Sequence, residues 1–542
     1  MTFIHTAAMP NNLTTKVWFS TGMTYPWPEQ AAGVKPNVGI CLSGGGTRAM
    51  SAAMGQLRAL IDLGFMKSVD YMSSVSGGSW AATAFAYYNT GAQNDEEFLG
   101  AITDPKDITR EGLDNLPESS LGWGATKDLG DAIDRAIIDG FKEDFIWAAA
   151  IGDIFFKRFG LWDNANKQYF SLDAATVAAI IAANPSLATA PFVTVRQPSN
   201  YTMPYLLING SMDGPTKGTP YSPDPMVMIT YSPLYCGIPF QQTIDYQSKH
   251  LKALGAGGTV TAVVGGGFIE PFAWDGGSPI GPVSDGTATV PPSAAPFGLV
   301  NASGTSSSAF AAIFEKIKDL DHLLPEQDYW PPMATGTQQP AQSFDFGDGG
   351  NLENYGIIPL VMRGVQKIVV FINTESKLNV SYDPTTTPSS KDIDLSLAWL
   401  FGMTTEGAPP NQIFPTADFA TLVHALQAKK NAGQPIVARM THDIVANTWW
   451  GVPGGGQVEV VWFYLDEVNS WKSQIGSDEV RFQLDLGDAG EFAHFPNYKT
   501  IDENPLRPLS LTLLTARQVN LLADLTCWIV RQSSDELNAL LG

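Results

Sequence analysis

One serine in the sequence has neighbours that would suit a nucleophile. In the stretch YMSSVSGGSWAATAF, Ser76 directly follows an apolar run that ends at Val75. The small residues Ser74, Gly77 and Gly78 surround it, a near match to the G-x-S-x-G pattern of a serine on a sharp strand-to-helix turn. A serine that only caps a helix would have similar neighbours. This stretch alone therefore leaves two interpretations open, a nucleophile or a helix cap.

A run of three glycines upstream could supply hydrogen-bond donors. In the stretch LSGGGTRAM, Gly44, Gly45 and Gly46 lie between a strand-like run and a helix-like run. Backbone N–H groups at the start of a helix can bind a phosphate or a reaction oxyanion, and a tight structural turn is the alternative. Arg48 opens the helix and could bind a substrate phosphate or lie on the surface. Nucleotide binding is disfavoured, because the lysine of a phosphate-binding loop is absent.

An aspartate could serve as the base that activates the serine. A serine nucleophile needs a base within hydrogen-bond reach, and histidine is the usual one. None of the six histidines lies in a motif-like setting. Asp348 precedes Gly349 and Gly350 in FDFGDGGN, although an Asp-Gly-Gly triplet alone is typical of turns. A Ser-Asp pair beside a glycine loop would account for all three stretches.

The apolar periodicity around these residues predicts an α/β fold. A strand at 38–42, a helix ending near Gly64, a strand ending at Val75 and a helix to about Tyr88 form a βαβα unit. We therefore expect a central, mostly parallel sheet flanked by helices, within one catalytic domain that spans residues 1–542. Further strands are expected at 205–210, 226–230, 364–373 and 458–466, and a C-terminal helix with a capping box at Thr515 and Gln518.

Four segments depart from the alternation of strands and helices. Residues 1–36 are Pro-rich and are predicted to be irregular. Residues 90–200 are mainly helical in pattern and are expected to form a cap or lid insertion. Residues 253–308 are rich in Gly, Ser, Thr and Pro, which favours loops. The aromatic stretch 145–162 is either a lid or interface helix or ordinary core.

The composition excludes several classes of function. The 54 Asp and Glu residues against 32 Lys and Arg give a net charge of −22, which argues against nucleic-acid binding. The three cysteines are far apart, and no two histidines have the spacing of a helical zinc motif. We therefore expect neither a metal ion nor a cofactor. We see no signal peptide and no apolar run of membrane-spanning length. These features predict a cytoplasmic protein that can contact membranes peripherally, and leave its oligomeric state open.

The motifs SGGGTRAM, SVSGGSW and DGG, in this order, resemble those of a known group of lipases. This group is the catalytic domain of cytosolic phospholipase A2 and fungal phospholipase B, within the patatin-like lipases. The segments at 302–314 and 353–371 also resemble the group, so the likeness extends from about residue 38 to the C-terminal helix. Ser74 stands where the group usually has glycine. No N-terminal calcium-dependent membrane module is expected, because only about 37 residues precede the first predicted strand.

The resemblance implies a role for each motif. It implies a lipid acyl hydrolase that cleaves fatty-acyl esters of phospholipids or lysophospholipids at a membrane or micelle interface. Acyl transfer, or hydrolysis of neutral lipids or galactolipids by the same dyad, is the alternative, and a non-catalytic lipid-binding protein is a further one. The implied site has Ser76 as nucleophile, Asp348 as base, Gly44, Gly45 and Gly46 as oxyanion hole, Arg48 at the substrate phosphate, and Gly77, Gly78, Gly349 and Gly350 as supporting turn residues.

Overall fold

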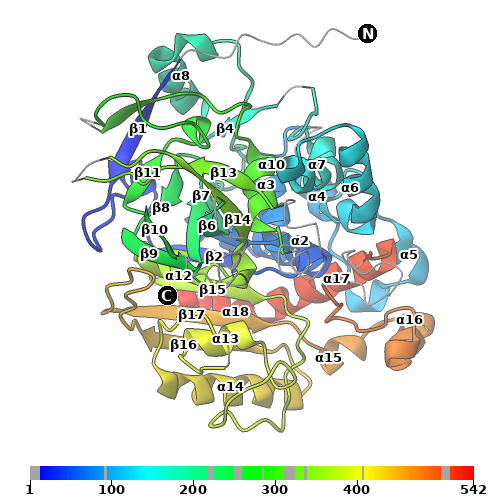
Figure 1. Cartoon of the computed structure of the whole chain (residues 1–542). Helices are drawn as coiled ribbons and strands as arrows, with labels where there is room; N and C mark the ends of the chain where they lie inside the picture. The colour runs from blue at the N-terminus through cyan, green and yellow to red at the C-terminus, as the bar shows by residue number, and fades with distance from the viewer. Residues whose placement is uncertain are drawn as a thin grey trace, which may run out of the picture.

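One mixed sheet organises the chain and has thirteen strands among the residues that the structure describes (Figure 1). The computed structural model describes residues 12–90, 94–165, 167–216, 225–247, 259–283, 286–309, 324–334, 338–405, 408–501 and 513–542. The α/β prediction is confirmed, because the strands at the centre of the sheet are parallel and helices flank them. In spatial order the parallel strands are β6 (Tyr205–Pro215), β3 (Tyr71–Val75), β2 (Val38–Leu42), β15 (Lys367–Ile372) and β17 (Gln457–Tyr464).

Antiparallel strands extend this parallel centre on both sides. The strand β16 (Val437–Asp443) pairs with β17 at one edge, and β14 (Gln342–Asp348) pairs with the outer half of β6. Two small separate sheets pair β9 with β10 and β4 with β5. The remaining strands are β7 (Val227–Tyr231), β8 (Cys236–Ile238), β11 (Gly267–Ile269), β1 (Leu13–Phe19), β12 (Thr287–Val290), β13 (Glu326–Tyr329), β9 (Gln242–Gln247), β10 (Thr259–Val264), β4 (Tyr169–Ser171) and β5 (Phe192–Thr194).

The two faces of the sheet are both buried, which explains why β2, β3 and β6 are buried at every position. Successive side chains of a strand point to opposite faces. Ile40 and Leu42 of β2 accordingly belong to one apolar cluster, with α2 (Gly46–Asp62), α3 (Gly77–Tyr87) and α17 (Ala516–Gln532). Cys41, between them, belongs to a second cluster with α12 (Ile357–Met362), α13 (Leu395–Leu400) and α14 (Thr416–Asn431). Parallel strands covered on both faces are typical of α/β proteins.

The C-terminal helix α17 packs directly against α2, as Figure 1 shows. The close approach depends on Gly55, because a Cβ there would lie closer than 3.0 Å to the carbonyl oxygen of Ala523. The predicted capping box is confirmed at the start of α17. The N–H of Thr515 donates to Gln518 Oε1 at 2.8 Å, and the N–H of Gln518 donates to Thr515 Oγ1 at 3.2 Å.

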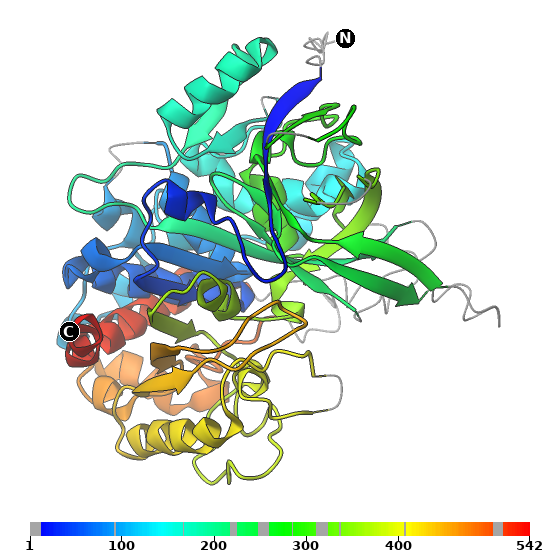
Figure 2. The ribbon, with the colours of Figure 1, turned by 90° about the vertical axis from the view of Figure 1, so that its left-hand side faces the viewer.

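Two segments predicted to lack regular structure contain strands. Residues 13–19 form β1, which Figure 2 shows running beside strands from the middle of the chain. The described part of 253–308 contains β10, β11, β12 and the helix α10 (Leu299–Ser306). Both predictions are wrong for these residues. The strands are short, and their partners lie far away in the sequence, so local composition does not reveal them.

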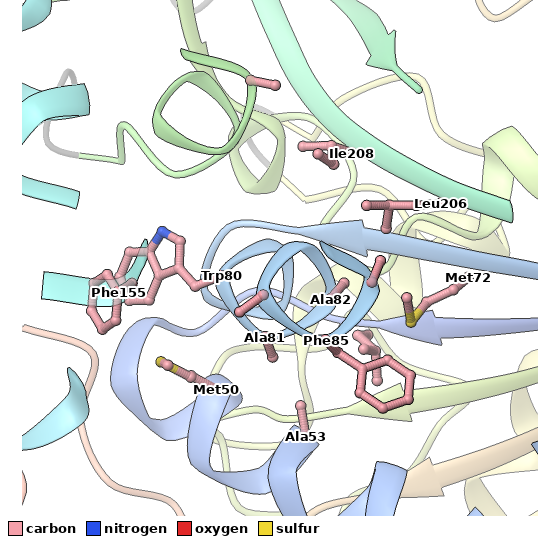
Figure 3. Close-up of a cluster of buried hydrophobic side chains, with 14 of the residues drawn as sticks. Met50, Ala53, Met72, Trp80, Ala81, Ala82, Phe85, Phe155, Leu206 and Ile208 are labelled. Atoms are coloured by element: carbon pink, nitrogen blue, oxygen red, sulfur yellow. The ribbon is translucent and has the colours of Figure 1, made fainter. Parts of the chain in front are cut away.

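The segment 90–200 contains mainly helices, as its pattern predicts. Most of the aromatic stretch 145–162 belongs to the core, since the residues from Ile146 to Ile151 are buried, as are Ile154, Phe155, Phe156, Phe159, Leu161 and Trp162. Phe155 stacks on Trp80 of α3 with ring centroids 4.2 Å apart (Figure 3). A cap or lid role for residues 90–200 stays a prediction. The helices are α4 (Asp95–Leu99), α5 (Arg110–Asp114), α6 (Leu129–Ile138), α7 (Ile146–Ile151) and α8 (Ala174–Ala183).

The remaining helices lie at the ends and edges of this framework. They are α1 (Pro28–Ala31), α15 (Asn469–Lys472), α16 (Asp478–Asp485) and α18 (Ser534–Leu541). Among the residues that the structure describes, no helix combines the length and the apolar character that crossing a membrane requires.

Candidate active site

Ser76 occupies a strained turn between β3 and α3. Its backbone has φ 52° and ψ −127°, and positive φ is rare for a residue that carries a Cβ. Such strain persists only where the surrounding structure enforces it, and it is frequent at functional sites. The two glycines that follow Ser76 are packed closely against neighbouring backbone. A Cβ on Gly77 would lie closer than 3.0 Å to the carbonyl oxygen of Gly46, and one on Gly78 equally close to that of Leu42.

The backbone N–H of Ser76 is held by the end of α10. It donates to the carbonyl oxygen of Ser306 at 3.0 Å and to Ser306 Oγ at 3.1 Å. Ser306 Oγ in turn donates to the carbonyl oxygen of Asn209 at 2.6 Å. The hydroxyl group of Ser76 makes no hydrogen bond to the first N–H groups of α3, so it does not cap this helix.

Ser74, where the lipase group usually has glycine, is accommodated without an unsatisfied polar group. Its side chain is buried in β3, and its Oγ donates to the carbonyl oxygen of Leu207 at 3.1 Å. Ser79 Oγ donates to Ser74 Oγ at 3.1 Å. The departure at Ser74 is thus compatible with the turn geometry.

The topology of β6 brings Asp348 to Ser76. Along one edge of β6, Asn209 pairs with Val75, the last residue of β3. The next residue, Gly210, pairs with Asp348, the last residue of β14. Because β3 is parallel and β14 antiparallel to β6, the carboxyl ends of the two strands meet on this edge. Two residues 272 positions apart in the chain thereby become neighbours.

The two side chains form a hydrogen bond. Ser76 Oγ donates to Asp348 Oδ2 at 2.8 Å, and the N–H of Gly350 donates to Asp348 Oδ1 at 2.6 Å. Both side chains are largely buried, with 7% of Ser76 and 2% of Asp348 exposed. Gly349 permits this approach, because a Cβ there would lie closer than 3.0 Å to the carbonyl oxygen of Asn209. The arrangement suits a serine with a carboxylate base.

Burial changes the pKa of the carboxyl group of Asp348. It raises the pKa of Asp348 to about 7, although the hydrogen bonds from Gly350 and Ser76 oppose that shift. A pKa near the working pH is the optimum for a general base. A second buried carboxyl group, Asp213 on β6, also has its pKa raised to about 7 by burial, with a smaller contribution from the charge of Asp348.

The glycine loop lies beside the Ser76 turn, but its three amides differ. The N–H of Gly44 donates to the carbonyl oxygen of Asn354 at 2.9 Å. This N–H group is therefore already bonded within the protein, whereas the resemblance implies Gly44 as one of the three residues of the oxyanion hole. The N–H groups of Gly45 and Gly46 make no hydrogen bond to another described residue. Gly45 is half-buried and lines the same cavity as Ser76, whereas Gly46 is buried and does not line it; both adopt positive φ, 131° and 58°.

Arg48 is buried and already has several partners. Only 3% of the residue is exposed, and burial lowers its pKa. Nε donates to the carbonyl oxygen of Asn373 at 2.8 Å, while Nη1 donates to the carbonyl oxygen of Tyr498 and, at 3.1 Å, to Thr500 Oγ1. The alternative of a surface arginine is excluded. Its Nη2 faces Gly45, where a Cβ would lie closer than 3.0 Å, and Arg48 lines the cavity.

These residues surround one cavity of about 320 Å³. Among its described walls are Ser76, Asp348, Gly45 and Arg48, so the structure brings the three sequence motifs together. Asn354 and Asp394, which also line it, were not identified from the sequence. Asn354 lies in a segment noted only for its resemblance to the lipase group, and no pattern marks Asp394.

The histidines in the described part of the chain have other partners. His442 Nδ1 lies 2.8 Å from Asp418, and His494 Nδ1 lies 3.1 Å from Asp488. His424 Nδ1 lies 3.2 Å from Gln427 Oε1. None of these three lines the cavity with Ser76. Within the described residues, no group of three or more His, Cys, Asp or Glu side chains is arranged to hold a metal ion.

Comparison with known proteins supports a lipase relationship for part of the chain. Residues 40–214, which include the glycine loop and Ser76, match the family model described as Patatin-like phospholipase. Human cytosolic phospholipase A2 zeta is 49% identical over 49 residues, which cover 9% of this chain and 6% of that protein. Its mouse counterpart is 51% identical over 45 residues, 8% of this chain and 5% of that protein.

Solved structures of human GIVD cytosolic phospholipase A2 match over a longer range at lower identity. One structure, described without an inhibitor, is 14% identical to this chain with a TM-score of 0.41. The match covers 93% of this chain and 60% of that structure's chain. The complex with methyl gamma-linolenyl fluorophosphonate is 15% identical with a TM-score of 0.42, and covers 93% and 58%. This chain thus spans about three-fifths of these structures and a small part of the curated relatives.

Proposed function

We propose that this chain, whose residues 40–214 match the patatin-like phospholipases, hydrolyses fatty-acyl esters of phospholipids or lysophospholipids. The observation that carries the proposal is the 2.8 Å hydrogen bond from Ser76 Oγ to Asp348 Oδ2, on a strained turn that opens into a cavity. A carboxylate with a pKa of about 7 in this position suits the removal of a serine proton.

The proposed reaction has two steps. In the first, Asp348 takes the proton of Ser76 as Oγ attacks the ester carbonyl carbon. The N–H groups of Gly45 and Gly46 stabilise the oxyanion of the tetrahedral intermediate. The intermediate collapses to acyl-Ser76, and Asp348 passes the proton to the departing alcohol, which is a lysophospholipid or a glycerophosphodiester. In the second, Asp348 takes a proton from water, whose oxygen attacks acyl-Ser76, and the fatty acid leaves as the proton returns to Ser76.

Arg48 is proposed to act near the substrate phosphate. Its Nε and Nη1 groups are engaged by the protein, so Nη2, beside Gly45, is the group that can reach a ligand in the cavity. The buried guanidinium also links the glycine loop to the end of β15 through Asn373, and thereby steadies the proposed oxyanion-binding amides.

A labelling experiment combined with a lipid panel tests this proposal. We expect a fluorophosphonate probe to label the wild-type protein and the control Ser473→Ala, whose serine is exposed outside the cavity, but not Ser76→Ala. Mass spectrometry of the products should show free fatty acid from phospholipid or lysophospholipid. Asp348→Asn should reduce the rate by several orders of magnitude, whereas Asp134→Asn, an exposed carboxylate on α6, should not. Full activity of Asp348→Asn would exclude the dyad.

A further inference from the structure

The cavity in front of Ser76 is polar rather than apolar. Apart from two glycines, Ala309 and Leu395, each of its described lining residues carries a polar or charged side chain. Burying a fatty-acyl chain against such groups would leave their hydrogen bonds unmade. If Ser76 attacks a phospholipid ester as proposed, the described part of this cavity therefore fits the polar head group, which lies on the alcohol side of that ester.

One carboxylate in the cavity wall has an unused oxygen. Asp394, 8% exposed, precedes α13 and caps it. Its Oδ1 accepts hydrogen bonds from the hydroxyl group of Tyr355 and from the N–H of Ser396, both at 2.9 Å. Its Oδ2 accepts no hydrogen bond from a residue that the structure describes. A carboxylate group that lines a cavity and keeps one oxygen without a described donor can accept a charge-assisted hydrogen bond from a cationic ligand.

Besides Asp348 and Asp394, the cavity is lined by a third carboxylate, Glu375, whose charge is already compensated by the protein. Its Oε2 accepts from the N–H of Thr500 at 2.9 Å and lies 3.5 Å from Nη1 of Arg48. Burial raises the pKa of Glu375, but Arg48, Thr500 and Lys499 together hold it below its usual range. Glu375 and, more weakly, Asp394 both interact with the charge of Arg48. Of the two, only Asp394 keeps an oxygen that accepts no hydrogen bond from a described residue.

The lining also discriminates between cationic head groups. Quaternary ammonium groups such as choline are typically recognised by aromatic rings, and the described lining contains none. A primary ammonium has three N–H donors and needs oxygen acceptors. Asp394 Oδ2 is a charged acceptor, and Asn351, Ser376 and Ser396 line the same cavity with neutral ones.

We propose that Asp394 binds the primary ammonium group of an ethanolamine head group, with Arg48 beside the phosphate. The preferred substrates are then phosphatidylethanolamine and its lyso form, over choline and glycerol analogues of the same acyl composition. This inference rests on the proposed function, because it assigns the cavity to the alcohol portion of the ester that Ser76 attacks.

A binding measurement tests the head-group site without turnover. In Ser76→Ala protein, calorimetric titration should show sn-glycero-3-phosphoethanolamine binding at least about tenfold more tightly than the phosphocholine and phosphoglycerol analogues. Adding Asp394→Asn should abolish this preference, and asparagine can still cap α13. Adding Asp134→Asn, which removes one exposed charge, should leave it unchanged. Equal affinities, a preference for choline, or a preference that survives Asp394→Asn would overturn the proposal.

A rate measurement extends the test to catalysis. Short-chain lipids below their micelle concentration are suitable, because a protein with a net charge of −22 would in any case be repelled by an anionic interface. The ratio of kcat/KM for ethanolamine over glycerol lipids should fall about tenfold in Asp394→Asn and stay constant in Asp134→Asn. An unchanged ratio in Asp394→Asn contradicts the head-group site. Loss of hydrolysis for every lipid in wild type contradicts the proposed function instead, and leaves the calorimetric result as the test of binding.

Discussion

Two strand-to-helix junctions lie side by side at the carboxyl ends of β2 and β3, and they present different groups to the same cavity. The β2–α2 junction presents backbone, because Gly45, which lines the cavity, adopts φ 131° without a side chain. The β3–α3 junction presents a side chain, because Ser76 adopts φ 52° and carries a hydroxyl group. The same topology thus supplies hydrogen-bond donors at one junction and a candidate nucleophile at the other.

The junctions are also packed against each other. Gly77 of the second touches Gly46 of the first so closely that no Cβ would fit between them. A residue held in an unfavourable backbone conformation typically costs about 1–3 kcal/mol, and the surrounding packing must offset it. The strain at Ser76 is therefore maintained by the neighbouring glycine loop as well as by its own strand and helix.

The strongest way to break the second junction is Ser76→Gly. We expect hydrolysis to fall at least about 10⁴-fold, because the proposed nucleophile is gone. Stability should rise by about 1 kcal/mol relative to Ser76→Ala, since glycine adopts φ 52° without a steric penalty. Thermal unfolding of the two variants checks the second expectation. Equal melting temperatures would mean that the turn is not strained.

Gly45→Ala breaks the first junction. A Cβ at this position would approach Nη2 of Arg48 and the carbonyl oxygen of Asn373, and φ 131° is unfavourable for alanine. The shifted loop should lower kcat about 100- to 1000-fold, the usual effect of losing an oxyanion donor. Gly455→Ala is the matched control, because Gly455 also has positive φ but nothing lies within 4 Å of its Cβ position. A similar loss of activity in both variants would assign the effect to stability alone.

The pH dependence separates the side-chain junction from the backbone junction, because only the former depends on a titrating partner. With a pKa of about 7, Asp348 is the active base when deprotonated, so kcat/KM should rise about tenfold per pH unit below 7 and level off above it. The same raised pKa makes its contribution to stability largest below its unfolded value of 3.8, and that contribution is lost as pH rises through about 7. A rate profile that is flat between about pH 5 and 8 would contradict the assignment of the base.

The smallest effect on the β3–α3 junction is expected for Ser306→Ala. It removes one of the two acceptors that hold the N–H of Ser76, which should cost about 1 kcal/mol of stability. We expect kcat to fall several-fold with little change in KM. Ser307→Ala is the matched control, because the hydroxyl group of this buried neighbour bonds, among the described residues, to the carbonyl oxygens of Ser303 and Gly304. If both variants lower kcat equally, Ser306 has a structural role only.

The regions predicted correctly are those in which the structure depends on adjacent residues. The βαβα unit around the two junctions matches the predicted strands at 38–42 and ending at Val75, because apolar runs and glycines there are local signals. The strands β1, β10, β11 and β12 were missed, because pairing partners elsewhere in the chain stabilise them. Ser306 and Asn354 were missed for a related reason, since their residue types carry no sign of the contacts that they make.

The sequence by itself determined the α/β class and the chemistry that each motif could supply, because strand, turn and helix signals and reactive residue types are local properties. Only the tertiary structure decided which motifs meet. Asp348 reaches Ser76 because β14 and β3 end at adjacent positions on one edge of β6. Gly44 is occupied by Asn354, and Asp394 faces the cavity, because segments distant in sequence converge there. Such encounters depend on the register and packing of the whole sheet, which no single stretch encodes.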